Sequence, residues 1–281
     1  MWRIFLSFIV LQHIFIFNSN AQLLVGPVGG LGVSKIFFFD QTSADAYKTL
    51  PSVGIDGGLM GSLVVRKNFV LNAQLLYSYR TKHISGRNQP NSDAQFKFSS
   101  TMQYIELPIF YVLEFKSLTG NPTGRGGRVK TYNWFIGGGP TISYWLSGKS
   151  TLHSSNLLEN GIDHVNYTSV FGADNSGIPP SITSTKEYIS EANRFQFAIN
   201  ITGGVAFEPV GFHKIVTFAQ FNIAQTFLAK SDVSLPSYDV DVLRAKNHSF
   251  KISVAYLFDT KMETSKKGKS TKNKEVQKKR R

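Results

Sequence analysis

Residues 69–80 read FVLNAQLLYSYR and decide the fold, because apolar side chains occupy every second position. One face of an extended chain would carry the side chains of Phe69, Leu71, Ala73, Leu75, Tyr77 and Tyr79. The opposite face would carry Asn72, Gln74, Ser78 and Arg80. This period of two is the period of a β-strand, whose successive side chains point to opposite faces. The stretch therefore predicts a strand with one face suited to lipid and the other suited to water.

Residues 132–146 repeat the pattern and add aromatic rings at both ends of the apolar face. That face holds Tyr132, Trp134, Ile136, Ile142, Tyr144 and Leu146. Thr131, Asn133, Thr141 and Ser143 lie opposite. A strand tilted by about 40° rises roughly 30 Å between the outermost tyrosines, close to the apolar band of roughly 25 Å between the aromatic girdles of a membrane barrel. The spacing of the rings predicts a strand that crosses a membrane.

About eight segments alternate in this way: 22–35, 52–66, 69–83, 101–115, 130–146, 193–208, 214–228 and 247–258. The connections between them alternate between long and short, in the order 36–51, 67–68, 84–100, 116–129, 147–192, 209–213 and 229–246. Outer-membrane barrels have an even number of strands, short periplasmic turns and long outer loops. The sequence thus predicts an all-β protein, a transmembrane antiparallel up-and-down β-barrel with both termini in the periplasm.

The first residues resemble an export signal. Arg3 supplies a positive charge, residues 4–17 are almost wholly apolar, and Ser19-Asn20-Ala21 offers a small-residue cleavage site. An uncleaved membrane anchor is the alternative, but the apolar run is interrupted and falls short of the roughly 20 residues that a spanning helix needs. We expect a signal peptide over 1–21, a barrel over 22–258 and a tail over 259–281.

A soluble eight-stranded barrel or sandwich also alternates along its strands. The export signal, the spacing of the aromatic rings and the order of the connections favour the membrane barrel, and hence the cell outer membrane as its location. No later stretch approaches 18 consecutive apolar residues, which excludes a helical membrane protein. Cysteine is absent, so disulfides, thiolate metal sites and cysteine nucleophiles are excluded as well.

The positive charge of the chain is concentrated at its C-terminal end. Of the formal net charge of +13, a surplus of eight belongs to residues 261–281 and one to Arg3, which leaves +4 for residues 22–260. The tail has almost no apolar residues and should be disordered by itself. It ends in Lys278, Lys279, Arg280 and Arg281, which we identify as candidate docking residues for a periplasmic envelope or secretion protein. Export makes nucleic acid an improbable partner, and a solvated tail without a partner is the alternative.

Three charged residues are expected inside the barrel. Alternation places Arg80, Glu106 and Lys251 on inward faces, and the first two lie on strands that should pair. An internal ion-pair network is the favoured interpretation, and a polar gate or binding site is the alternative. The interior of an eight-stranded barrel is just wide enough to be filled by side chains, so an open porin is disfavoured.

No enzyme site or cofactor site is indicated. Some small outer-membrane barrels carry a serine and a histidine on one face for lipid chemistry, but His248 and Ser249 are adjacent and should point to opposite faces. The remaining histidines show no metal-binding spacing along the chain, so we expect no metal and no cofactor. Residues 147–192 are rich in Ser, Asn and Thr and are predicted to form a long outer loop, the place for recognition of a surface partner.

Four features carry a resemblance to a known family: the signal ending Ala21-Gln22, the strand Tyr104-Ile105-Glu106-Leu107-Pro108, the strand Gly137-Gly138-Gly139-Pro140 and a tyrosine-bearing last strand. In these features the chain resembles the small outer-membrane β-barrel proteins of Bacteroidetes, which include the PorT-like proteins. The resemblance covers residues 22–258 and implies a barrel, and PorT-like members are implicated in type IX secretion and gliding. The chain departs from the usual pattern because 23 residues follow the terminal aromatic residue, Phe258.

These observations together predict a non-enzymatic structural or interaction protein of the cell envelope, embedded in outer-membrane lipid. The resemblance implies an accessory role in protein secretion or gliding. A lipid-modifying outer-membrane enzyme and a narrow pore or carrier are the alternatives.

Overall fold

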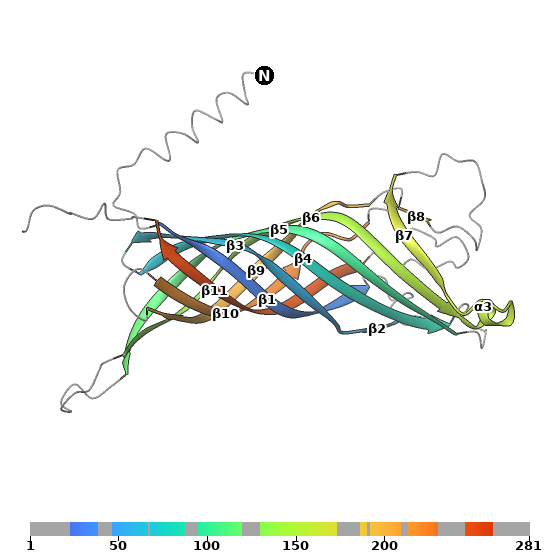
Figure 1. Ribbon diagram of the computed structural model, residues 1–281, viewed down its shortest axis with the longest axis horizontal. Coiled ribbons are helices and arrows are strands. Elements are labelled where there is room, and N and C mark those ends of the chain that lie inside the picture. The colour runs from blue at the N-terminus through green and yellow to red at the C-terminus, as the bar shows by residue number, and fades with distance from the viewer. Residues whose placement is uncertain are drawn as a thin grey trace, which may run out of the picture.

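Eight antiparallel strands form a closed ring in the computed structural model (Figure 1). The ring contains β1 (Leu23–Phe38), β3 (Ser52–Arg66), β4 (Phe69–Arg87), β5 (Gln95–Thr119), β6 (Lys130–Ser154), β9 (Phe195–Phe207), β10 (His213–Ala224) and β11 (Ala245–Asp259). Each strand pairs with the next along the chain, and β11 closes the ring on β1. The predicted eight-stranded antiparallel barrel is confirmed.

The structure describes residues 23–38, 47–66, 68–87, 95–119, 130–172, 186–189, 192–208, 213–229 and 245–260. The predicted signal peptide, 1–21, and the basic residues 261–281 lie outside these ranges. No helix among the described residues is long and apolar enough to cross a membrane.

The two ends of the barrel differ. One end, here called the turn end, holds the start of β1 and the end of β11, where the Thr260 hydroxyl donates a hydrogen bond of 2.8 Å to the Leu23 carbonyl oxygen. The other end, here called the loop end, carries β2 (Tyr47–Leu50), α3 (Ser155–Glu159), β7 (Val165–Phe171) and β8 (Lys186–Ile189), at the right of Figure 1. The shortest connection, between β3 and β4, lies at the turn end and the longest, between β6 and β9, lies at the loop end, as expected from the sequence. The order is not strict, because β5 ends at Thr119 and β6 begins at Lys130 at the turn end, whereas β4 ends at Arg87 and β5 begins at Gln95, a shorter connection, at the loop end.

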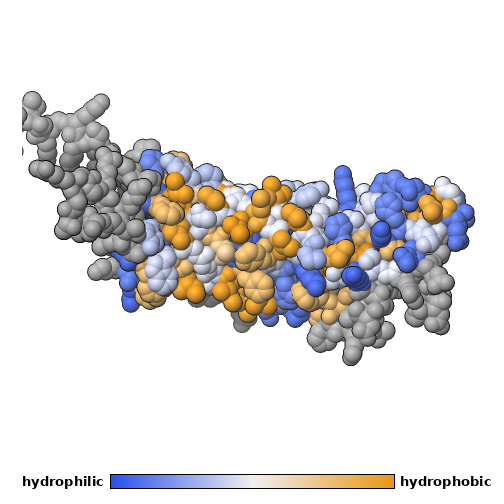
Figure 2. Space-filling view, turned by 90° about the horizontal axis from the view of Figure 1, so that it is seen from below, coloured by the Kyte–Doolittle hydropathy of each residue, from blue (hydrophilic) through white to orange (hydrophobic). Residues whose placement is uncertain are grey.

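The outer wall of the ring is apolar. Side chains that alternate along each strand point outward, so large hydrophobic residues from every strand of the ring are exposed. Figure 2 shows hydrophobic residues spread over the wall in view and hydrophilic residues gathered at the loop end. Among the exposed residues are Leu31, Val53, Leu59, Leu75, Tyr77, Ile105, Trp134, Ile136, Ile201, Phe221 and Ile252. A continuous apolar wall of this kind is suited to contact with lipid.

The interior of the ring is filled by side chains in layers. Toward the turn end lies an apolar cluster that contains Leu24, Val28, Met60, Val70, Leu76, Phe110, Val112, Phe135, Ala206, Val216, Phe218, Ala255 and Leu257. Toward the loop end lies a second cluster of Ile36, Met102, Tyr104, Trp145, Ile189, Leu228, Ala229 and Ala245. We call these the lower and upper clusters. Polar and charged side chains occupy the space between them. Because of the two clusters, the inward faces are more apolar than the alternation alone suggested.

Two inward-facing glycines allow neighbouring strands to approach closely. A Cβ atom on Gly137 would lie 1.9 Å from the Tyr111 carbonyl oxygen, and one on Gly139 would lie 2.1 Å from the Ile109 carbonyl oxygen. Such contacts are impossible for any residue with a side chain. The Gly137-Gly138-Gly139 motif therefore has a packing role in the wall of the barrel.

Three ring strands extend farthest beyond their predicted bounds at the loop end. β4 extends to Arg87, β5 starts at Gln95, and β6 extends to Ser154. The cause in β6 is a β-bulge, since Tyr104 pairs with Trp145 but Gln103 pairs with Ser147. A bulge inserts one residue and exchanges inward and outward positions beyond it. The alternation therefore breaks near residue 146, where the predicted strand stopped.

The prediction of one long loop over 147–192 is wrong for most of its described residues. Residues up to Ser154 continue β6, α3 follows, and β7 pairs with the end of β6 before β8 pairs with β7. This extension is held by a third apolar cluster, formed by Ile84, Phe96, Phe98, Leu152, Leu157 and Tyr167. Its apolar residues are sparse among the Ser, Asn and Thr residues of the segment, which hid them in the composition.

Candidate functional site

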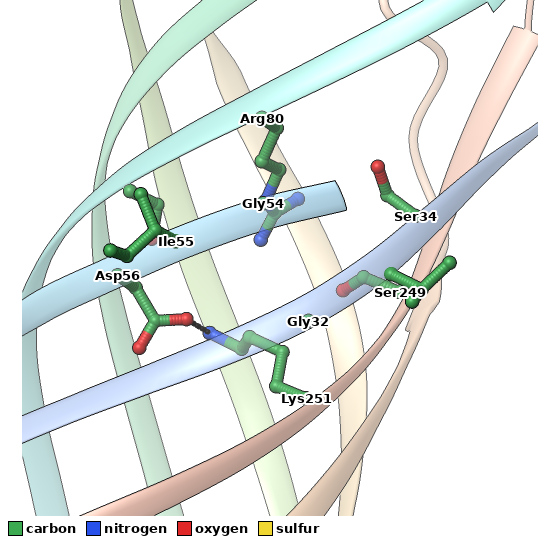
Figure 3. A pocket seen from close by; sticks show the side chains of 10 residues that line it. Gly32, Ser34, Gly54, Ile55, Asp56, Arg80, Ser249 and Lys251 are labelled. Atoms are coloured by element: carbon green, nitrogen blue, oxygen red, sulfur yellow. Dashed lines mark ion pairs between the residues drawn. The ribbon is translucent and has the colours of Figure 1, made fainter. Parts of the chain in front are cut away.

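A network of four charged side chains occupies the interior between the lower and upper clusters. Arg80 of β4 forms an ion pair with Glu106 of β5. The Lys251 ammonium of β11 lies 3.2 Å from Glu106 Oε2 and 3.3 Å from Asp56 Oδ2 of β3. Figure 3 shows Arg80 and Lys251 reaching toward the same region of the lumen from strands on either side of β1 and β3. We call these four residues the lumen network.

The lumen network combines strong burial with balanced charge. Glu106 is fully buried, and the other three residues are almost so. Two cations face two carboxylates, and the Arg80 guanidinium also lies 5.3 Å from the centre of the Tyr104 ring. Buried charges are tolerated when each has a partner and further hydrogen bonds. The network therefore joins β3, β4, β5 and β11 across the lumen.

The structure brings together all three residues expected inside the barrel. Glu106 forms ion pairs with both Arg80 and Lys251. The sequence reasoning did not select Asp56, although the alternation of its strand placed it on the inward face. It also missed a second ion pair nearer the turn end, in which the Lys214 ammonium lies 2.6 Å from Glu114 Oε1. Selecting these residues requires the register between strands, which alternation does not supply.

The space around the network contains a small pocket beside the ion pairs. Its lining includes Asp56, Arg80 and Lys251 together with Gly32, Ser34, Gly54 and Ser249, all of which are labelled in Figure 3. Among the described residues, the buried side-chain amides of Asn200 and Gln220 have no hydrogen-bond partner in the protein. Such amides are normally satisfied by bound water. The arrangement is a buried polar layer between two apolar clusters.

His248 and Ser249 lie on opposite sides of the barrel wall. Ser249 is buried in the lumen, whereas the His248 ring is on the outer side, 5.0 Å from the Phe37 ring. The Nδ1 atom of His248 accepts a hydrogen bond of 3.1 Å from the backbone N–H of Ala224. The two side chains therefore do not form a nucleophile and base pair, as the alternation predicted.

The candidate docking residues Lys278, Lys279, Arg280 and Arg281 lie outside the described residues. The structure therefore does not place them relative to the lumen network.

A family model described as an outer membrane protein beta-barrel domain matches residues 18–224. The matched range includes every strand of the ring from β1 to β10. No curated protein matches the chain.

Several solved structures are similar to this chain over most of its length at low sequence identity. Neisserial surface protein A (NspA) is 8% identical, with a TM-score of 0.32 and coverage of 85% of this chain and 99% of that chain. Ail, the attachment invasion locus protein of Yersinia pestis, is 10% identical, with a TM-score of 0.31 and coverage of 84% and 98%. The outer membrane protease OmpT from Escherichia coli is 8% identical, with a TM-score of 0.24 and coverage of 85% and 95%.

Proposed function

Because the chain belongs to the outer membrane protein beta-barrel domain family and is located in the outer membrane, we propose that it is a non-enzymatic structural or interaction protein of the cell envelope. In this role the barrel is a rigid, closed scaffold. It presents its loop end to the outside and its terminal segments to the periplasm, in the orientation that short periplasmic turns and long outer loops favour.

The filling of the barrel interior by side chains is the observation that carries this proposal. The lower cluster and the upper cluster fill the interior on either side of the lumen network. A barrel of eight strands has room for side chains but not for an additional aqueous channel. Ion pairs that tie four strands together across the lumen stabilise one shape of the barrel, which favours a scaffold over a pore or carrier.

The separation of His248 from Ser249 supports the non-enzymatic part of the proposal. Nucleophilic catalysis requires a base within hydrogen-bond reach of the nucleophile. Here one side chain faces the lumen and the other lies on the outer wall, so this pair offers no support for a lipid-modifying enzyme.

The finer part of the proposal is that the protein is a PorT-like barrel of Bacteroidetes, accessory to protein secretion or gliding. It is supported by the motifs that carry the resemblance and by what they do in the barrel. The Tyr104 to Pro108 strand contributes Tyr104 to the upper cluster and Glu106 to the lumen network. The glycine motif permits close packing of β5 against β6.

An accessory protein needs a binding element on the side of its partner, and the basic tail is the candidate. With ten Lys and Arg residues and two Glu residues, residues 261–281 would attract an acidic periplasmic surface of an envelope or secretion protein. The tail follows β11 directly at the turn end, where the described chain stops at residue 260.

Removing the tail should abolish capture of a periplasmic partner without unfolding the barrel. The chain should be stopped after Thr260, because the Thr260 hydroxyl and backbone N–H both donate to the Leu23 carbonyl oxygen and join the two terminal strands. We expect mass spectrometry of proteins purified with the full chain from outer membranes to identify a defined envelope or secretion protein that the truncated chain lacks.

A charge variant separates the contribution of the tail charges from that of its length. Replacing Lys278, Lys279, Arg280 and Arg281 by Gln keeps every residue of the tail but removes four positive charges. Capture should weaken in this variant and should weaken in the full chain when salt is raised, because exposed charge attraction is screened. All three chains are first shown to be inserted in the membrane. The accessory role is contradicted if the full chain, the truncated chain and the charge variant purify with the same set of partners.

A further inference from the structure

Two histidines at either end of the connection between β6 and β7 meet at the tip of the loop end. Leu152 pairs with Val165 at the end of the ladder, so His153, on β6, and His164, directly before β7, flank the last pair. Both side chains are exposed, and their ring centres lie 5.4 Å apart. Asp163 is also exposed, and its Oδ2 atom lies 2.9 Å from Nδ1 of His164.

The connection between these residues explains why they meet. α3 begins directly after β6, and the backbone N–H groups of Asn160 and Ile162 donate to the Leu157 carbonyl oxygen at its end. Gly161 follows with a φ of +74°, a left-handed conformation that suits glycine and reverses the chain. Leu157 is buried in the third apolar cluster, which anchors the turn beneath the histidines.

The three side chains have the geometry of a metal site. One ligand atom from each of His153, Asp163 and His164 lies within 4.8 Å of the others. Around a tetrahedral ion with bonds of about 2.0–2.2 Å, ligand atoms are roughly 3.4 Å apart. Exposed side chains can close this difference by small rotations about their χ angles.

We propose that His153, Asp163 and His164 form a surface site for a divalent transition-metal ion of the zinc class. Two imidazoles with one carboxylate suit zinc, copper or nickel, whereas calcium and magnesium prefer oxygen ligands alone. The site would leave coordination positions for water or for a group from a partner at the cell surface. This role is separate from the scaffold function and from the basic tail.

Two charged residues at the site have opposite effects on a bound cation: Asp163 attracts it, and Lys97 repels it. The Asp163 carboxylate is available to the metal or, through the 2.9 Å contact of its Oδ2 atom with Nδ1, to orient the His164 ring. Lys97 is the Cα partner of His153 on β5 and adds a positive charge next to the site. A bound cation is repelled by this lysine, whereas a bound anion would be attracted to it.

Zinc titration of the full-length protein in detergent micelles tests the proposal. The chain should carry no histidine tag, and binding should be followed by isothermal titration calorimetry. We expect the wild type to bind a zinc ion and the variants His153→Gln and His164→Gln to bind it at least about tenfold more weakly. His83→Gln, which alters another exposed histidine on β4, should bind like the wild type.

Two further measurements identify the occupant and guard against misfolded variants. Lys97→Gln should strengthen zinc binding, and Cu²⁺ bound to the wild type should show coordination by two imidazole nitrogens in electron paramagnetic resonance. Each variant is first shown to be folded by its heat-dependent migration in electrophoresis. The proposal is overturned if folded His153→Gln and His164→Gln retain wild-type affinity, if the wild type binds no zinc, or if Lys97→Gln weakens binding.

Discussion

Glu106→Gln should destabilise the folded barrel by about 3–5 kcal/mol, the usual cost of removing one partner of a buried ion pair. The substitution preserves the size of the side chain but leaves Arg80 and Lys251 facing a single carboxylate, Asp56. Because all four groups are buried, water cannot compensate the excess charge. The free energy of unfolding should be measured by urea titration of the protein refolded into lipid vesicles.

Two further variants show whether this loss comes from unbalanced charge. Glu159→Gln removes an exposed carboxylate on α3 and should change the free energy of unfolding by less than about 0.5 kcal/mol. Adding Lys251→Gln to Glu106→Gln leaves one cation and one anion in the lumen, so the double variant should be more stable than the sum of the single variants predicts. Additive losses, or a negligible effect of Glu106→Gln alone, would contradict the role given to the lumen network.

Ile201→Arg should destabilise the inserted barrel by about 2–4 kcal/mol, the cost of a cation near the middle of the lipid-facing wall. Ile201 is half exposed on β9, midway between the exposed rings of Phe195 and Phe207. The cost arises because the charged guanidinium would lie in contact with lipid, where it loses the hydration that it has in the unfolded chain. It should be measured by the same unfolding titration in vesicles.

Leu158→Arg is the matched control for this wall variant. Leu158 is 65% exposed, compared with 50% for Ile201, but it lies on α3 beyond the ring. An arginine there meets water, so the free energy of unfolding should change by less than about 0.5 kcal/mol. Equal, small effects of the two substitutions would indicate that the apolar wall does not face lipid.

The sequence predicted the ring well because the barrel repeats one local rule. Alternation placed Leu75 and Tyr77 on the outside and Gln74 on the inside, and the structure agrees. The ends of the strands at the loop end were harder to predict from the sequence. In β6 the reason is the bulge, which exchanges the inward and outward positions. The eight residues beyond residue 146 therefore seemed to belong to a loop.

The lumen network was only partly visible in the sequence. Alternation indicates which charges point inward, and this was sufficient for Arg80, Glu106 and Lys251. The height of a side chain along the barrel axis depends on strand register, which decides that Asp56 completes the network and that Lys214 meets Glu114 elsewhere. Contacts across an irregular turn, such as that between His153 and His164, leave no spacing motif along the chain.

The accessibility of the lumen to water-soluble reagents tests the central claim, a closed barrel, most directly. The chain has no cysteine, so Ser253→Cys introduces a single thiol of similar size on β11, at a residue that is 2% exposed between the lumen network and the lower cluster. Thr168→Cys, on the exposed face of β7, is the control. With a charged methanethiosulfonate reagent added to the folded protein, we predict rapid modification of Thr168→Cys and none of Ser253→Cys until the barrel is unfolded. Modification of Ser253→Cys in the folded barrel at the rate of the control would show a lumen open to water and would contradict the account.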